Sequence, residues 1–273
     1  MQAATTGGSA MKTNGTLFAT IGAWVLMGVP TIGLSAAAAA PTPTVISGAG
    51  NIAPLVEQFR AKLGDNLGNK GPAKKGRREI NWDGLPDELA APAYLAPDIF
   101  KNRGVILTTP GEGIQVSARA GNPGGVLPRF GNINPTYVTL FNHFSAERLF
   151  SPIGSNAVDV RFVVAGTNRA ALARGFGAVY VDVDREHTAF EFFDRDDKSL
   201  GRFAVPANDG GFSFLGVVFD KAIVARVHID YGTNQLGPND DADNDVAVMD
   251  DFIYDEPQAI GSSGKAPKTI SWD

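Results

Sequence analysis

The sequence predicts an all-β protein, a jelly-roll-like β-sandwich with one short N-terminal helix. Many short apolar segments follow residue 79, and Gly, Pro, Asn and Asp separate them, which is the pattern of sandwich or barrel strands. Helical spacing of apolar residues occurs convincingly in one segment only. The chain has no cysteine, so a hydrophobic core rather than a disulfide framework must stabilise the fold.

Residues 1–40 have the parts of a secretory signal peptide. Lys12 precedes an uncharged, largely apolar stretch at 17–34, and small residues lead to Pro41, as in a cleavable signal. The alternative is a membrane anchor, which needs about 20 apolar residues, but Gly28 and Pro30 favour cleavage. We therefore expect a secreted protein, periplasmic or extracellular, with no membrane span after signal cleavage.

Residues 41–78 are expected to hold one helix and a basic linker. The helix is predicted over 51–64, with Asn51 as N-cap and Gly64 as the stop. Five apolar residues recur there at helical spacing: Ile52, Leu55, Val56, Phe59 and Leu63.

The linker that follows is rich in Gly and bases. Lys74, Lys75, Arg77 and Arg78 form a short basic run that could bind an anionic polymer, although such a run is more often a solvated connection. The formal net charge of the whole chain is −5. This mild acidity argues against nucleic-acid binding, which needs a basic face to neutralise phosphates.

Residues 79–257 are expected to form the β-sandwich domain, and 258–273 a flexible tail with little to bury. Ten segments have strand character: 79–84, 103–109, 113–119, 157–164, 175–184, 188–194, 200–206, 212–220, 223–232 and 245–254. Short strands at this spacing, with turn residues between them, make a single sandwich of normal size.

An acidic loop precedes the last strand. Five oxygen-bearing residues match EF-hand ligand positions loosely: Asn239, Asp241, Asp243, Asp245 and Asp250. Their flanks are strands rather than helices, so no EF-hand unit is expected. The loop is suited to Ca²⁺ by its oxygen donors, and a polar hairpin that binds nothing is the alternative.

The last strand carries two adjacent aspartates, Asp250 and Asp251, within an apolar run. Strict alternation would place them on opposite faces of the sheet. A carboxylate buried without a partner costs several kcal/mol. We therefore expect a cation, backbone N–H groups or an arginine to compensate them, with Arg148, Arg161 and Arg226 as the arginine candidates.

The segment 175–184 has a related pattern. Alternation would place Tyr180, Asp182 and Asp184 on an outward face and the valines between them in the core. The two aspartates would then lie roughly 7 Å apart along the strand, close enough to lean toward one ion or one sugar hydroxyl. A solvated strand end is the alternative.

The ordered motifs INWDG (80–84), GFGAVYVDVD (175–184) and MDDFIY (249–254) resemble those of an uncharacterised family of exported bacterial β-sandwich proteins. The closing strand is similar to that of jelly-roll, carbohydrate-binding-module-like domains. In such domains the first and last strands are neighbours, and a structural Ca²⁺ often lies beside an aspartate of the last strand. The resemblance therefore implies that Asp83 faces Asp250 or Asp251 at a metal site.

The functional prediction is a secreted, non-enzymatic binding or surface/matrix module with a structural calcium ion. Its expected partner is an extracellular polysaccharide or another cell-surface component. The sequence contains no GxSxG, HExxH or phosphate-binding loop motif. The alternative is a glycoside-active enzyme on a jelly-roll scaffold, which would use a pair of carboxylates.

Overall fold

The computed structural model describes residues 42–185 and 187–261. The predicted signal peptide and residues 262–273 of the predicted tail lie outside the described residues. Of the described helices, none has the length and apolar character that crossing a bilayer requires.

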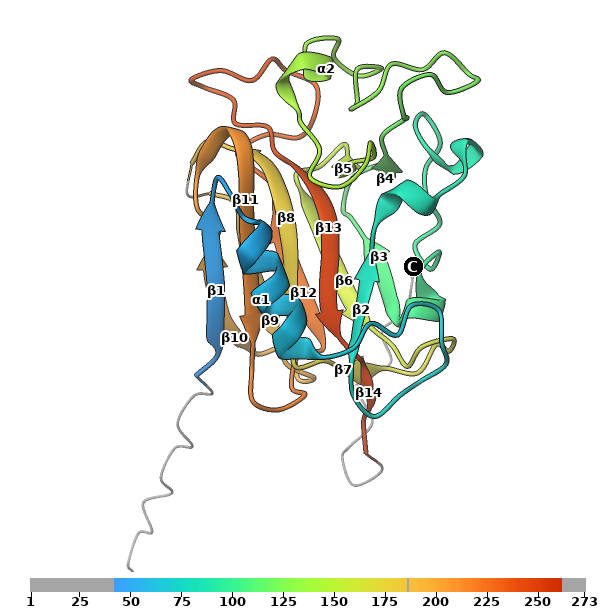
Figure 1. The fold of residues 1–273 in the computed structure, drawn as a ribbon, viewed down its shortest axis with the longest axis vertical. Helices are drawn as coiled ribbons and strands as arrows, with labels where there is room; N and C mark the ends of the chain where they lie inside the picture. Colours follow the sequence, from blue (N-terminus) through green and yellow to red (C-terminus); the bar gives the residue numbers. More distant parts are fainter. Residues whose placement is uncertain (1–41, 186, 262–273) are drawn as a thin grey trace, which may run out of the picture. The chain divides into compact units, whose positions relative to one another are not determined.

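Two antiparallel β-sheets dominate the described part of the chain (Figure 1). The first sheet follows the order β1 (Thr44–Ala49), β11 (Asn208–Val218), β8 (Gly175–Val183), β13 (Val248–Asp255), β5 (Phe150–Ile153), β4 (Gly113–Val116), and β2 (Arg77–Ile80) also pairs with β13. The second sheet follows β10 (Ser199–Ala204), β9 (Ala189–Phe193), β12 (Arg226–Asp230), β6 (Ala157–Phe162), β3 (Val105–Thr108). The prediction of an all-β sandwich is confirmed.

The remaining elements are short. The helices are α1 (Ala53–Leu63), α2 (Tyr137–Leu140) and three 3₁₀ turns, η1 (Trp82–Gly84), η2 (Asp87–Leu89) and η3 (Lys101–Arg103). A small two-stranded ladder joins β7 (Ala171–Leu172) to β14 (Gln258–Ala259). The predicted flexible tail therefore begins too early, because residues 258 and 259 are paired in this ladder.

The main core lies between the two sheets and is rich in aromatic rings. Phe176 on the first sheet meets Phe190 on the second in an edge-to-face contact, with ring centroids 5.1 Å apart. Trp82 stacks on Phe150 at 4.4 Å, and Phe252 packs edge-on against the same indole at 4.9 Å. Such aromatic pairs add about 1 kcal/mol each to the stability that burial provides.

Helix α1 covers the outer face of the first sheet (Figure 1). The Phe59 ring lies over Gly216, where an added Cβ would stand 2.5 Å from a ring carbon. Gly64 ends the helix with a φ of 92°, and its N–H donates to the Arg60 carbonyl. The predicted Asn51 cap is wrong, because the N-cap is Ile52 and no side chain caps the helix.

The sandwich begins earlier than residue 79. All six residues of β1 pair with β11, so this strand belongs to the first sheet. The segment between α1 and β2 is likewise attached to the sandwich through Arg78. This guanidinium forms a fully buried ion pair with Glu256, and it donates to the carbonyls of Gly68 at 2.8 Å and Lys70 at 2.6 Å. The solvated role predicted for Arg78 is therefore wrong.

Alternation along β8 is reversed from the prediction. Phe176, Ala178 and Tyr180 pack in the core between the sheets, while Val179 packs under α1. The prediction from alternating residues was wrong because both faces of β8 are buried, so the apolar valines did not have to face the core between the sheets.

A β-bulge changes the predicted alternation of β13. Met249 pairs with Tyr180 and Phe252 pairs with Ala178, with a register shift between them. Met249 and Phe252 both join the core between the sheets. Asp250 and Asp251 therefore share the outer side of the first sheet, and the expectation of opposite faces is wrong because a bulge sets two residues against one.

Candidate metal centre

The structure brings Asp83, Asp250 and Asp251 together around one hydroxyl, and we call these residues with Ser145 the serine-centred cluster. The Ser145 Oγ lies 3.0 Å from Asp83 Oδ2, 2.9 Å from Asp250 Oδ1 and 3.0 Å from Asp251 Oδ1. Three carboxylates thus converge on a group that carries a single donor hydrogen.

Strand pairing builds this cluster. β2 pairs with β13, so η1, which follows β2, lies beside the β13 bulge. The Trp82 Nε1 donates to the Asp250 carbonyl at 2.6 Å, and the Asn81 side chain accepts from the Asp83 N–H at 3.0 Å. These two bonds fix η1 so that Asp83 faces the bulge.

Most of the compensating donors are backbone N–H groups. Asp250 Oδ2 accepts from the N–H of Phe144 at 2.7 Å and of Ser145 at 3.2 Å. The N–H of Arg148 donates to Asp83 at 2.9 Å. Burial, and then the charge of Asp251, raise the pKa of Asp250 to about 7, so this carboxyl tends to keep a proton that the cluster can share.

The arginine candidates from the sequence have other side-chain partners. Arg148 reaches Asp87 at 2.6 Å with its guanidinium. Arg161 and Arg226 both pair with Asp159 on the second sheet. Arg60 of α1 is the arginine that approaches the cluster, with an N–O distance of 3.4 Å to Asp251. The sequence could not indicate Arg60, because this contact depends on where α1 packs.

The chemistry of the serine-centred cluster is that of a hydrogen-bonded network. Calcium binds carboxylate oxygens at about 2.3–2.6 Å, and the centre of this group is filled by the Ser145 hydroxyl. Asp83 and Asp250 accept backbone N–H groups, and Asp251 has the shared Ser145 hydroxyl and the weak contact with Arg60. The cluster therefore depends less on an ion than a group of acids without such donors.

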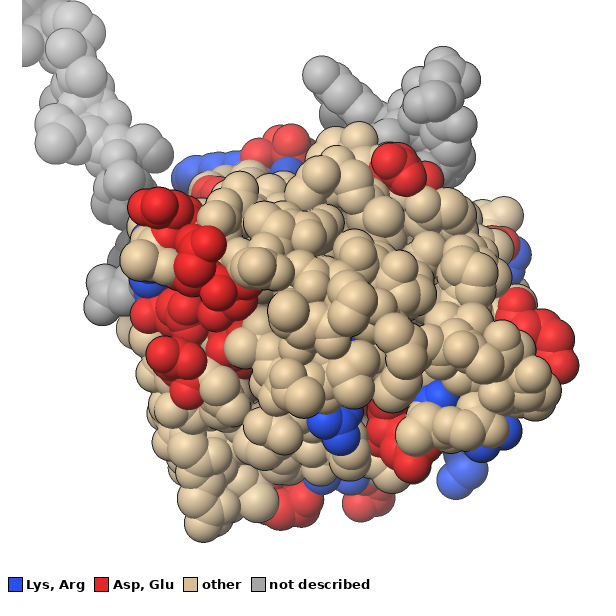
Figure 2. Space-filling model, turned by 90° about the horizontal axis from the view of Figure 1, so that it is seen from above, with Lys and Arg blue, Asp and Glu red and all other residues tan. Residues whose placement is uncertain are grey.

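A second group of acids lies at the loop end of the sandwich, the end that carries α2 and the 232–247 loop in Figure 1. We call it the Asp184 cluster, and its members are Asp182, Asp184, Asp209, Asp240 and Asp245. The ligand oxygens of Asp182, Asp184 and Asp209 lie within 4.8 Å of one another, and so do those of Asp184, Asp240 and Asp245. Figure 2 looks onto this end and shows acidic side chains gathered along one margin. These clusters of acidic residues could hold a metal ion.

This cluster has fewer hydrogen-bond donors than the first. Asp245 is 0% exposed, and neither of its carboxylate oxygens forms a hydrogen bond of good geometry. The N–H groups of Asp184 and Arg185 lie near enough to lower its pKa, but the effect of burial is larger. Asp182 is also 0% exposed; its Oδ1 accepts from the Gly210 N–H at 2.7 Å, but its Oδ2 has no partner. Among the described residues, no salt bridge reaches any of the five acids of this cluster.

Burial and mutual repulsion raise the pKa values across the Asp184 cluster. Desolvation is the largest cause for Asp182, whose pKa rises to about 7, and for Asp240, whose pKa rises to about 6. The pKa values of Asp184 and Asp245 also rise, first by burial and then by repulsion from neighbouring aspartates. The charge of Arg185 lowers the pKa values of Asp184 and Asp245, but the effects of burial and of neighbouring carboxylates are larger.

The loop from 237 to 246 is held against α2. The Tyr137 hydroxyl donates to the Pro238 carbonyl at 2.6 Å and accepts from the Gly237 N–H at 2.9 Å. The Asn134 amide donates to Asn239 Oδ1 at 2.9 Å. The loop therefore presents Asp240 and Asp245 from a fixed backbone.

The EF-hand-like positions do not converge on one point. Asp241 uses its carboxylate to accept the N–H groups of Asp243 and Asn244 at 2.8 and 3.0 Å, and the Asp243 side chain is exposed. Asp245 joins the Asp184 cluster, whereas Asp250 joins the serine-centred cluster. The residues that match the EF-hand spacing loosely in sequence therefore do not form one binding site in the structure.

Tyr180, a weak ligand candidate from the sequence, lies in the core between the sheets, fully buried beside Phe190 and Tyr231. It faces away from any surface ligand. Asp209 and Asp240 are cluster members that the sequence reasoning missed. Asp209 lies in an Asn-Asp-Gly-Gly segment at the start of β11, but only the pairing of β11 with β8 shows that this segment lies near Asp182.

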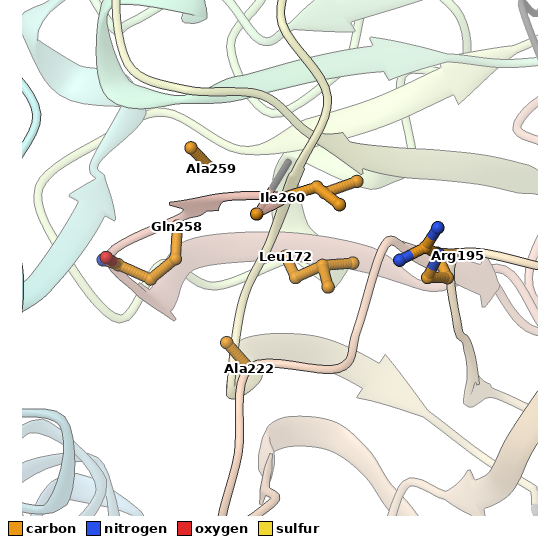
Figure 3. Close-up of a pocket in the computed structure, with 7 residues that line it drawn as sticks. Leu172, Arg195, Ala222, Gln258, Ala259 and Ile260 are labelled. Carbon is orange, nitrogen blue, oxygen red and sulfur yellow. The ribbon is translucent and has the colours of Figure 1, made fainter. Parts of the chain in front are cut away.

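Cavities add little to the acidic clusters. One of about 370 Å³ lies beside the β7–β14 ladder and is lined mainly by Leu172, Ala222, Gln258 and Ile260, with Arg195 at its side (Figure 3). Another of about 390 Å³ at the loop end is lined by Thr136, Thr139, Leu140, Asn239 and Asp240. Neither cavity has two carboxylates on its walls.

Comparison with known proteins gives no assignment: no family model matches the sequence, and no curated protein matches it. The geometry of the two clusters therefore carries the functional argument.

Proposed function

We propose that this protein is an exported, non-enzymatic binding module whose loop end is stabilised by calcium. Its partner is an extracellular polysaccharide or another cell-surface component. Support comes from the signal-peptide pattern before Pro41, the all-β sandwich, and the unpaired acids at the loop end.

The observation that carries the calcium proposal is the carboxylate of Asp245. It is buried, has no partner for either oxygen, and meets Asp184 and Asp240. An ionised carboxylate left in this state costs several kcal/mol. A divalent cation removes that cost, because it supplies the positive charge that the surrounding residues lack.

The spacing of the oxygens fits calcium. Two oxygens that bind one Ca²⁺ at about 2.3–2.6 Å can be at most about 5 Å apart, and the ligand atoms here lie within 4.8 Å of one another. Carboxylate oxygens are the hard ligands that Ca²⁺ prefers. Mg²⁺ requires a tighter octahedral shell at about 2.0–2.1 Å, so it is the weaker competitor.

Thermal melting tests the calcium proposal directly. We expect the melting midpoint to rise by several degrees between chelator and millimolar calcium, because a ligand that binds only the folded state stabilises it by mass action. Magnesium at the same concentration is the control and should raise the midpoint less. An unchanged midpoint in calcium would remove the ion from the proposed function.

A glycan array with the purified protein tests the partner. Binding to a defined class of polysaccharide supports the carbohydrate-binding form of the proposal. Silence on the array, together with a calcium-dependent melting midpoint, favours a structural or matrix role for the module.

The alternative function, a glycoside-active enzyme, has one observation in its favour. Asp182, whose pKa is raised to about 7, has a carboxylate oxygen within 4.8 Å of one of Asp184, and glycosidases use a pair of neighbouring carboxyl groups of which one has a raised pKa. Asp182 is completely buried, however. Hydrolysis of a polysaccharide that is lost in Asp182→Asn would establish the enzyme and overturn the binding module.

A further inference from the structure

We propose that the Asp184 cluster binds two calcium ions, with the Asp184 carboxylate bridging them. This inference rests on the proposed function, because it specifies how many ions the loop end binds and which residues hold each. The acids divide into two triads that share one member: Asp182, Asp184 and Asp209 in the first, and Asp184, Asp240 and Asp245 in the second.

Each triad has its own buried oxygen without a partner. In the first it is Asp182 Oδ2, and in the second it is either oxygen of Asp245. Asp184 also has a buried oxygen without a partner, Oδ1. A carboxylate has two oxygens and can accept from both sides, so Asp184 can bind one ion in each triad.

The charges balance better with two ions than with one. Five carboxylates meet here, and no lysine or arginine of the described residues pairs with any of them. Arg185 is the nearest base, yet its guanidinium donates to the carbonyls of Asp241 and Ala242. Its charge nevertheless lowers the pKa values of Asp184 and Asp245. With Arg185 counted, one Ca²⁺ would leave two negative charges uncompensated and two ions would leave none, at a site where Asp182 and Asp245 are buried, Asp184 and Asp240 half-buried and Asp209 exposed.

The two ions would connect three separate segments. Asp182 lies at the end of β8 and Asp184 directly after it, Asp209 lies at the start of β11, and Asp240 and Asp245 lie in the loop before β13. Because the ions share Asp184, the first to bind fixes a ligand of the second. We therefore expect binding of the two ions to be coupled.

Calcium titration of the full chain after chelator treatment tests this inference. Isothermal titration calorimetry and metal analysis after dialysis should both give two calcium ions per chain. Asp209→Asn and Asp245→Asn should each reduce the count to one, because each removes a ligand of a single triad. Asp184→Asn should weaken both sites more than tenfold. Asp243→Asn, an exposed acid of the same loop, is the matched control and should keep two.

The possible outcomes separate the two proposals. One ion per chain, lost in Asp245→Asn and kept in Asp209→Asn, would overturn the two-ion site and leave the calcium-stabilised module standing. No bound ion would overturn both. Far-ultraviolet circular dichroism and the chelator melting curve of each variant show whether a lost ion reflects a lost ligand or a lost fold. If Asp184→Asn is unfolded, the counts in Asp209→Asn and Asp245→Asn decide the question.

Discussion

The serine-centred cluster and the Asp184 cluster contain the same kind of side chain and solve the problem of burial differently. In the first, the acids accept hydrogen bonds from Ser145 and from the N–H groups of Phe144, Ser145 and Arg148. In the second, Asp182 and Asp240 each accept one N–H. Neither oxygen of Asp245 forms a hydrogen bond of good geometry, although the N–H groups of Asp184 and Arg185 lower its pKa. Both clusters lie beside irregularities of neighbouring strands, the β13 bulge and the left-handed Asp182.

The difference shows that acid density alone does not indicate an ion site. In the serine-centred cluster, backbone N–H groups donate to Asp83 and Asp250, and Asp251 has the Ser145 hydroxyl and the Arg60 guanidinium as partners. The Asp184 cluster has fewer donors and four buried carboxylate oxygens without a partner, so a bound cation would contribute more stability there. Counting donors around each buried carboxylate therefore separates a hydrogen-bonded network from a candidate metal site.

The largest expected effect is the pH dependence of stability without calcium. The pKa values of Asp250 and Asp182 are raised to about 7, and that of Asp240 to about 6, from 3.8. A raised folded-state pKa gives stability that is complete below the unfolded value and is lost as the pH rises through the folded value. Linkage sets an upper bound of about 4 kcal/mol for Asp250 alone. Chelator-treated protein should thus lose stability in urea melts from pH 4 to pH 7.5.

Calcium binding and the substitution Asp250→Asn should each remove the contribution of one cluster to this pH dependence. Saturating calcium should remove the part that comes from Asp182 and Asp240, because a bound cation favours their ionised form. Asp250→Asn should remove the part that comes from the serine-centred cluster, with or without calcium. If calcium abolished the whole slope, the two clusters would not differ as described.

Loss of the central hydroxyl is the next largest effect. Ser145→Ala should lower the free energy of unfolding by about 2 kcal/mol, because buried acceptors lose their donor. Ser213→Ala is the matched control: Ser213 is also buried, and its hydroxyl has no partner, so its removal should cost little. Equal effects of the two substitutions in denaturant melts would show that the Ser145 contacts contribute no stability.

Sequence periodicity was sufficient for the class of fold but not for the faces of its strands. Turn residues and short apolar runs predicted the sandwich, and α1 was located from the spacing of residues such as Phe59. The inward and outward faces of β8 were reversed because helix α1 buries the side of the strand that carries Val179, so this side is apolar although it faces away from the other sheet. β1 was missed because its six residues, close to the predicted signal peptide, do not alternate clearly between apolar and polar side chains. Only their pairing with β11 identifies them as a strand.

The two clusters differ in how many of their residues could be predicted from the sequence. Adjacent acids in an apolar strand predicted that Asp250 and Asp251 need compensation, and the resemblance implied Asp83 beside them. Ser145 could not be predicted, because nothing in the sequence around a loop serine indicates that the fold places its hydroxyl beside the β13 bulge. Asp184 and Asp245 were each identified, but in separate hypotheses, since only the β8–β11–β13 pairing unites their segments.

The effect of Asp245→Asn on stability should be opposite in chelator and in calcium. In chelator it should raise the free energy of unfolding by about 1 kcal/mol, because it removes a buried charge that has no partner. In calcium it should lower the melting midpoint, because it removes a ligand. Asp255→Asn is the control: Asp255 is buried but pairs with Arg174 at 2.9 Å, so it should destabilise in both conditions. A destabilised Asp245→Asn in chelator would mean that an unseen donor already satisfies this carboxylate.

The smallest expected effect is that of a substitution in the acidic loop, which tests whether calcium binds to this loop or to the Asp184 cluster. Asp243→Ala removes an exposed acid at an EF-hand-like position, and surface substitutions of this kind change stability by less than about 0.5 kcal/mol. The calcium-induced rise in melting midpoint should be unchanged, because Asp243 belongs to neither triad. If the rise fell as far as it does in Asp245→Asn, the loop itself would bind the ion, and the contrast between donor-rich and donor-poor acids would no longer locate the site.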